Sequence, residues 1–155
     1  NGVANIIEFL FKTFNPQNAY FGEKDYQQLQ IIRNLNKSIG DSTNVIQCPT
    51  IRNKNGLALS SRNANLTDKE QKIASKIYEC LLDVKKMAKV NSYQEIVAQV
   101  SFKFLKIKEC NLDYFMIANT DTLVEISSRD SIYRNRAFIA VKFGETRLID
   151  NIALS

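Results

Sequence analysis

The apolar positions in the first fifty residues follow helical and strand patterns in turn. Residues 2–14 carry apolar side chains at helical spacing, which predicts a helix. A short apolar run at 19–22 predicts a buried strand, and residues 44–48 predict another. Between them we expect a helix that begins at Asp25 and ends at Gly40. The apolar residues of the two helices are Val3, Ile6, Ile7, Leu10, Phe11 and Phe14 in the first, and Leu29, Ile32, Leu35 and Ile39 in the second.

This helix–strand–helix–strand order is typical of the end of a parallel, doubly wound sheet. Residues 50–64 have no apolar periodicity and are rich in Asn, Ser, Gly and Arg, which predicts a loop. We therefore expect two lobes, residues 1–50 and residues 51–155. The wide apolar face of the first helix leads us to expect that further chain covers it.

The second lobe is predicted to combine helices with a small antiparallel sheet. Thr67 and Glu70 form a capping-box pattern that starts a helix running to about residue 90. Ser92 and Glu95 repeat the pattern for a further helix. Three strands are then expected, at 112–118, 137–143 and 146–152, the last two joined by a tight turn at Gly144. The predicted fold class is α/β, with an α+β second lobe.

Composition fits a soluble globular protein, since 45% of the 155 residues are hydrophobic and 24% are charged. No apolar run approaches the roughly 20 residues that span a bilayer, and no signal peptide is visible. Cys48, Cys80 and Cys110 lie far apart and show no metal-binding spacing, so we expect reduced cysteines. We expect a cytoplasmic protein without membrane partners.

The formal net charge of +5 permits nucleic-acid binding. Acidic residues are interspersed among the basic ones, however, and a phosphate-bearing ligand explains a basic excess equally well. The chain contains no histidine, which excludes His-based acid–base catalysis and His metal sites within it.

The segment 19–28 places a strand, a glycine, charged residues and a helix start close together, as α/β proteins do at ligand sites. Lys24 could contact phosphate, or it could be a solvated lysine. Asp25 could bond ribose hydroxyls, or it could cap the helix. Gln28, one turn further on the same face, could bond a polar substrate or face water.

A second polar segment, Ser60, Ser61 and Arg62, could bind a triphosphate, or it could be an ordinary flexible polar loop before a helix. The two serines have no histidine partner, which makes a serine hydrolase an unfavourable interpretation. Arg147 and Asp150 are predicted to form a structural ion pair.

Four segments in order give the chain a resemblance to pantothenate synthetases, the pantoate–β-alanine ligases. They are Phe-Gly-Glu-Lys-Asp-Tyr-Gln-Gln at 21–28, Pro-Thr-Ile-Arg at 49–52, Gly-Leu-Ala-Leu-Ser-Ser-Arg-Asn at 56–63 and Gly-Glu-Thr-Arg-Leu-Ile-Asp-Asn at 144–151. The resemblance implies that residues 1–50 end a Rossmann-like nucleotidyl-transferase domain and that residues 51–155 form its C-terminal lid domain. It also implies a cytoplasmic homodimer.

The family adenylates pantoate with ATP and Mg²⁺, releases pyrophosphate, and then joins the acyl group to β-alanine with release of AMP. By this resemblance Gly22 and Asp25 hold the ribose, Lys24 contacts the ATP phosphates and Gln28 binds pantoate. Ser60, Ser61 and Arg62 close on the triphosphate, and Ile51 and Leu59 border the adenine. No metal ligand is assigned to this chain.

The chain departs from the family in one respect. The family's His-x-Gly-His motif lies upstream of the region that this chain matches, and a chain without histidine does not contain it. We therefore expect a partial enzyme with little or no ligase activity alone. The main alternative is a catalytically incomplete ATP-binding fragment. A nucleic-acid-binding domain is disfavoured, because the sequence shows neither clustered basic residues nor aromatic residues placed for stacking, and we expect no nucleic-acid partner.

Overall fold

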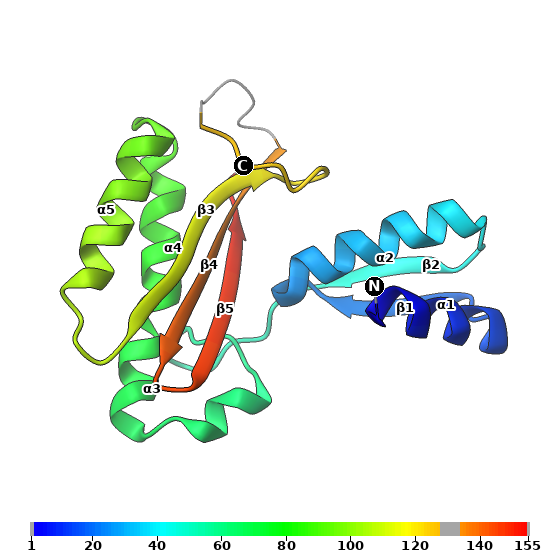
Figure 1. Ribbon diagram of the computed structural model, residues 1–155, viewed down its shortest axis with the longest axis horizontal. Helices are drawn as coiled ribbons and strands as arrows, with labels where there is room; N and C mark the ends of the chain where they lie inside the picture. The colour runs from blue at the N-terminus through cyan, green and yellow to red at the C-terminus, as the bar shows by residue number, and fades with distance from the viewer. Residues whose placement is uncertain (1, 128–133, 155) are drawn as a thin grey trace. The chain divides into compact units, whose positions relative to one another are not determined.

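The computed structural model describes residues 2–127 and 134–154. It divides the chain into two compact units, Asn1–Thr50 and Ile51–Ser155 (Figure 1). The first contains a two-stranded parallel sheet and the second a three-stranded antiparallel sheet, each accompanied by helices. This confirms the mixed α/β fold class. Within the described residues, no helix has the length and apolarity needed to cross a bilayer.

In the first unit a helix connects two parallel strands. The strands pair in register, from Asn18 opposite Asn44 to Gly22 opposite Cys48. The connecting helix packs on both strands and contacts the N-terminal helix. The elements are α1 (Gly2–Phe14), β1 (Asn18–Gly22), the 3-10 turn η1 (Glu23–Asp25), α2 (Tyr26–Ile39) and β2 (Asn44–Cys48).

Burial on α2 is concentrated in its first two turns. Tyr26, Leu29 and Ile32 are buried, whereas Leu35 and Ile39, also expected on the inner face, are only half-buried. The helix ends at Gly40, whose φ of +66° is the left-handed conformation that glycine adopts without strain. The predicted ends of this helix, Asp25 and Gly40, are the two residues that flank the observed helix.

In the second unit, helices pack against an antiparallel sheet with strand order β3-β4-β5. The central strand β4 is almost completely buried. Helix α4 packs on β4 and β5, and α5 packs on β3 (Figure 1). The elements are η2 (Ser61–Asn65), α3 (Asp68–Ala74), α4 (Lys76–Met87), α5 (Tyr93–Leu105), β3 (Asn111–Asn119), β4 (Asn135–Phe143) and β5 (Thr146–Ala153).

Both predicted capping boxes are present, at Thr67 and at Ser92. The single helix expected from Thr67 to about residue 90 is nevertheless wrong, because it breaks at Ser75 into α3 and α4. The Ser75 hydroxyl donates to the Lys72 carbonyl at 2.7 Å. A serine that bonds back to the preceding turn commonly bends a helix. The next helix, α5, ends at Leu105, so Ile107, which we expected within it, lies beyond.

Candidate functional site

The first group of predicted site residues lies where β1 ends. Because β1 and β2 are parallel, their carboxyl ends meet at one edge of the sheet. Gly22 is the last residue of β1, and η1 carries Lys24 immediately after it. The Lys24 side chain is only 15% exposed, so the interpretation as a fully solvated lysine does not fit. In open α/β sheets this edge is where ligands bind.

Asp25 occupies the N-cap position of α2 but makes no capping hydrogen bond with its side chain. The capping interpretation of its carboxylate is therefore wrong. The side chain is 49% exposed, and one carboxylate oxygen lies 3.8 Å from Lys24 Nζ. Gln28 is exposed on the first turn of α2. The structure thus gathers Gly22, Lys24, Asp25 and Gln28 at the junction of β1 and α2.

The second group lies in the other unit, on a hairpin-like segment that we call the 51–60 loop. An isolated antiparallel bridge pairs Arg52 with Ala58. The Leu59 amide donates to the Ile51 carbonyl at 2.9 Å, and the Asn53 amide donates to the Leu57 carbonyl at 2.9 Å. Ile51 and Leu59 are therefore adjacent, and their side chains are 66% and 52% exposed. Two exposed apolar side chains held side by side could flank a flat, apolar ring.

Ser60, Ser61 and Arg62 follow directly and are not the irregular loop that we expected. Ser61 begins the 3-10 helix η2, and the Ser60 hydroxyl caps it by accepting from the Arg62 amide at 3.3 Å. The Asn63 side chain ties this helix to the loop by donating to the Ala58 carbonyl at 3.0 Å. Ser61 and Arg62 are exposed. Their hydroxyl and guanidinium groups suit an anionic ligand.

The predicted pair between Arg147 and Asp150 is wrong. Asp150 pairs instead with Arg52, at 2.5 and 2.9 Å between guanidinium and carboxylate atoms. Arg147 pairs with Asp113 at 2.8 Å. Residues three apart in a strand point to opposite faces of the sheet, so the side chains of Arg147 and Asp150 cannot reach each other. The Asp113 pKa is lowered by its hydrogen bonds to Arg147 and Lys142.

The sequence alone predicted no role for Arg52, although this arginine belongs to the 49–52 segment of the family resemblance. Its carboxylate partner is 98 positions away in the sequence. The pattern of residues around Arg52 contained no signal for that contact. The only hint was an aspartate at an inward position of a predicted strand, since a buried charge needs a partner.

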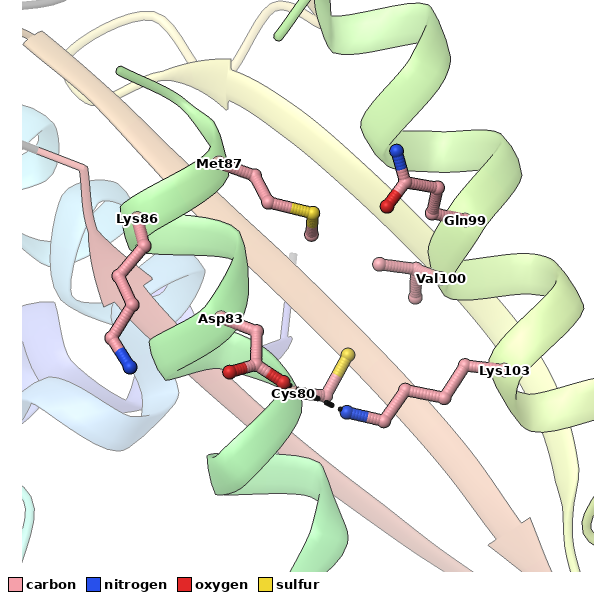
Figure 2. A pocket seen from close by; sticks show the side chains of 7 residues that line it. All are labelled: Cys80, Asp83, Lys86, Met87, Gln99, Val100 and Lys103. Atoms are coloured by element: carbon pink, nitrogen blue, oxygen red, sulfur yellow. Dashed lines mark hydrogen bonds and ion pairs between the residues drawn. The ribbon is translucent and has the colours of Figure 1, made fainter. Parts of the chain in front are cut away.

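A pocket of about 330 Å³ lies between α4 and α5, and no predicted site residue lines it (Figure 2). Two of its lining residues, Lys103 of α5 and Asp83 of α4, form an ion pair at 3.0 Å. Burial raises the pKa of the Cys80 thiol to about 11, so this thiol is protonated at neutral pH. The lining residues are Cys80, Asp83, Lys86, Met87, Gln99, Val100 and Lys103.

The described residues do not provide a metal centre of their own. Across 2–127 and 134–154, no cluster of three or more His, Cys, Asp or Glu side chains could hold an ion. The three cysteines are free thiols, as expected. The Mg²⁺ that the family resemblance implies thus finds no ligand set among the described residues.

Comparison with known proteins gives one consistent family. The family model described as pantoate-beta-alanine ligase matches residues 1–153. The chain is 39% identical over its whole length to pantothenate synthetase of Christiangramia forsetii, and 42% identical over 98% of its length to that of Azobacteroides pseudotrichonymphae. It covers 55% and 54% of those relatives, so it spans about half their length.

Solved structures agree with this result. The crystal structure of pantothenate synthetase from Thermus thermophilus superposes with a TM-score of 0.90 and 37% identity, over 99% of this chain and 55% of that one. A second similar structure is the crystal structure of pantoate-beta-alanine ligase from Francisella tularensis, in complex with beta-gamma ATP and beta-alanine. It has a TM-score of 0.67 and 32% identity, over 99% of this chain and 49% of that one.

Proposed function

The chain belongs to the pantoate–β-alanine ligase family, and from that premise we propose that it forms part of an enzyme that condenses pantoate with β-alanine, using ATP. The observation that carries the proposal is the family match over residues 1–153. The Francisella relative, solved with an ATP compound and beta-alanine, supports two of the three substrates. We use the term complete ligase for a protein that contains this chain together with the part that its relatives have and this chain does not cover.

The proposed reaction has two steps. A carboxylate oxygen of pantoate attacks the α-phosphorus of ATP, and the bond from that phosphorus to the bridging oxygen breaks, releasing pyrophosphate. The amine of β-alanine then attacks the acyl carbon of pantoyl adenylate. The new C–N bond forms as the C–O bond to AMP breaks, and the nitrogen loses a proton. The first step builds negative charge on phosphate oxygens, which cations and hydroxyls placed beforehand stabilise.

In the first unit we assign the phosphates to Lys24 and the ribose to Gly22 and Asp25. Lys24 suits this role because its side chain is largely covered at a ligand-binding edge of the sheet. The Asp25 carboxylate suits ribose hydroxyls because it is not used to cap α2. We assign pantoate to Gln28, whose exposed amide can both donate and accept hydrogen bonds.

In the second unit we assign the adenine to Ile51 and Leu59 and the triphosphate to the three residues that follow. The adjacent, exposed Ile51 and Leu59 side chains can border an aromatic ring. Because the Leu59 amide already donates to Ile51, a hydrogen bond to adenine here would use other backbone groups. Ser60, Ser61 and Arg62 offer two hydroxyls and a guanidinium to phosphate oxygens. Mg²⁺ would bind through the phosphates and water, as it does at many nucleotide sites.

The isolated chain is proposed to be a partial enzyme. The absence of histidine leaves it without the family's His-x-Gly-His motif. It retains the residues assigned to ATP, so the specific alternative is that it binds ATP without catalysing adenylation. The family membership also leads us to propose a cytoplasmic homodimer for the complete ligase.

Pantoate-dependent exchange between ATP and pyrophosphate tests this function directly. We expect exchange by the complete ligase and none by the 155-residue chain. Absence of exchange from both would contradict the proposed reaction. Exchange by the isolated chain, with its mass verified as 17.7 kDa, would contradict the partial-enzyme proposal and leave the reaction in place.

Lys24→Ala in the complete ligase should lower the adenylation rate by about 10²–10³-fold, because it removes one charge from the phosphate site. Single-turnover formation of pantoyl adenylate measures this rate. The matched control is Lys37→Ala, an exposed lysine of α2 outside the proposed site, which should leave the rate unchanged. An unchanged rate in Lys24→Ala would show that this lysine does not act on the phosphates.

A further inference from the structure

We propose that Arg52 is a positioning residue that fixes the 51–60 loop to α4 and β5, and thereby places Ile51, Leu59 and Ser60 for ATP. We call Arg52 and its three partners, Asp150, Tyr78 and Gly56, the clamp. Its task in catalysis rests on the proposed function, whereas its effect on the loop follows from contacts within the second unit alone.

The Arg52 guanidinium joins three separate parts of the unit. Its Nη1 and Nη2 donate to the two Asp150 carboxylate oxygens of β5 at 2.5 and 2.9 Å. Nη1 also donates to the Gly56 carbonyl at 3.1 Å, across the loop. Its Cζ lies 3.6 Å from the centre of the Tyr78 ring of α4. A planar fork that pairs with a carboxylate and stacks on an aromatic ring is held in direction as well as position.

The partners of Arg52 are themselves fixed. The Asp150 side chain is 4% exposed, and its carboxylate also accepts a hydrogen bond from the Asn151 amide at 2.8 Å. Tyr78 lies so close to Gly56 that an added Cβ would be 2.8 Å from its ring. The clamp therefore anchors the loop to residues that belong to the packed sheet and its covering helix.

Backbone contacts carry this anchoring to the residues assigned to ATP. Arg52 bridges to Ala58, and the Leu59 amide donates to the Ile51 carbonyl one position further along. The Asn63 side chain then links Ala58 to η2. Ile51 and Leu59 are mostly exposed, so packing does not hold their side chains. Their placement depends on the backbone of the loop, and Arg52 ties that backbone to the core.

The second unit provides a matched control pair. Arg147 donates to Asp113 at 2.8 Å, and its Cζ lies 5.6 Å from the centre of the Tyr114 ring. This arginine, aspartate and tyrosine are the same three residue types as in the clamp, with one hydrogen bond in place of two and a longer ring distance. They join β5 to β3 instead of joining β5 to the 51–60 loop. Arg147→Lys is therefore the same substitution at an arginine that also pairs with an aspartate but does not contact the 51–60 loop.

Amide hydrogen exchange on the 155-residue chain tests the clamp without nucleotide. The informative amides are those of Asn53, Gly56 and Leu59, each hydrogen-bonded within the loop at 2.9 Å. In Arg52→Lys we expect them to exchange about tenfold faster, because lysine loses the two-pronged pairing and the stacking. Arg147→Lys should leave their rates unchanged. Equal loop rates in wild type and Arg52→Lys would overturn the clamp.

Steady-state kinetics of the complete ligase then tests its use. In Arg52→Lys we expect the KM for ATP to rise about tenfold while the KM for β-alanine is unchanged, because only the proposed nucleotide contacts are displaced. A variant that merely folded less well would lose kcat and keep its KM for ATP, and that outcome would overturn the positioning role. An inactive wild-type ligase would contradict the proposed function, and the exchange rates would still decide the clamp.

A second variant keeps the inference testable if Arg52→Lys does not fold. Tyr78→Leu removes the ring under the guanidinium and leaves both hydrogen bonds to Asp150 in place. We expect a smaller change in the same direction, with faster exchange at Gly56 and a higher KM for ATP. Unchanged values for both would overturn the role of the clamp.

Discussion

At the scale of single residues, burial and hydrogen bonding determine which groups are charged. Hydrogen bonds to Ser92 lower the pKa of Glu95 at the start of α5, and those to Thr67 lower the pKa of Glu70 at the start of α3. Each carboxylate therefore stabilises the folded state fully when the pH is above the ordinary pKa of glutamate. This stabilisation is lost as the pH falls through the lowered pKa that the group has in the folded chain. The buried thiol of Cys80 is shifted in the opposite sense.

Cys80 should make the chain less stable at alkaline pH. Its pKa is about 11 in the folded chain because burial disfavours the thiolate, against an ordinary value of 9.0. Between these values the unfolded chain loses the proton first, so the free energy of unfolding should fall as the pH rises, by at most roughly 2–3 kcal/mol. Urea unfolding from pH 8 to 11 measures this. Cys80→Ala should show a smaller decline, and an equal decline would contradict the assignment.

Gly56→Ala should be more destabilising than Gly144→Ala, although both glycines have positive φ, +85° and +55°. A Cβ at Gly144 has open space, so only backbone strain of about 1 kcal/mol is expected. A Cβ at Gly56 would also meet the Tyr78 ring at 2.8 Å, which should cost roughly 1–3 kcal/mol more. Chemical denaturation of both variants measures the difference. Equal values would show that the Tyr78 ring moves aside freely.

At this scale the sequence predicted the position of single residues along their elements better than it predicted their partners in space. Arg147 and Asp150 stand close in the chain, but the alternation of a strand separates them and gives each another partner. Lys24 and Asp25 were correctly placed at the end of a strand, whereas the prediction that Asp25 caps its helix failed. Local sequence patterns predict helices and strands. They do not predict a pair such as Arg52 and Asp150, whose residues lie far apart in the sequence and meet only in the folded chain.

At the scale of elements, helix starts were well predicted because their determinants are local. The reciprocal hydrogen bonds of a capping box join residues three apart, so the sequence contains the whole motif. The break at Ser75 was missed because serine is compatible with a helix interior. Its bond to Lys72 is one of two geometries that its hydroxyl can adopt there.

Ser92→Ala should lower the free energy of unfolding by about 1 kcal/mol, because it removes the side chain that accepts from the Glu95 amide. The matched control is Ser101→Ala, an exposed serine within the same helix. That change should lie within about 0.5 kcal/mol of wild type, since alanine favours helix interiors. Urea unfolding measures both variants. An equal loss in the two would indicate that the cap contributes nothing.

At the scale of the whole molecule, the two units differ greatly in how much core they possess. The main cluster of buried apolar residues runs from Leu57 to Leu154 and lies entirely within the second unit. The first unit has two strands and buries few large apolar side chains, chiefly Phe11, Tyr26, Leu29 and Ile32. A two-stranded sheet with so small a core is marginal by itself.

A shortened chain of residues 51–155 should therefore fold alone, with a single cooperative thermal transition close to that of the same unit in the whole chain. Residues 1–50 alone should show little stable structure. Far-UV circular dichroism with heating measures both. A disordered 51–155 chain would show that its core needs the first unit.

The order of the strands, both capping boxes, the turn at Gly144, the α/β class and the family could all be predicted from the amino-acid sequence. These depend on local periodicity and short motifs, which need no knowledge of the fold. The partners of Asp150 and Arg147, the break between α3 and α4 at Ser75 and the clamp that Arg52 forms on the 51–60 loop became visible only in the folded chain. Those features join residues that come together only when strands pair and helices pack, and a contact across 98 positions leaves no local signal in the chain.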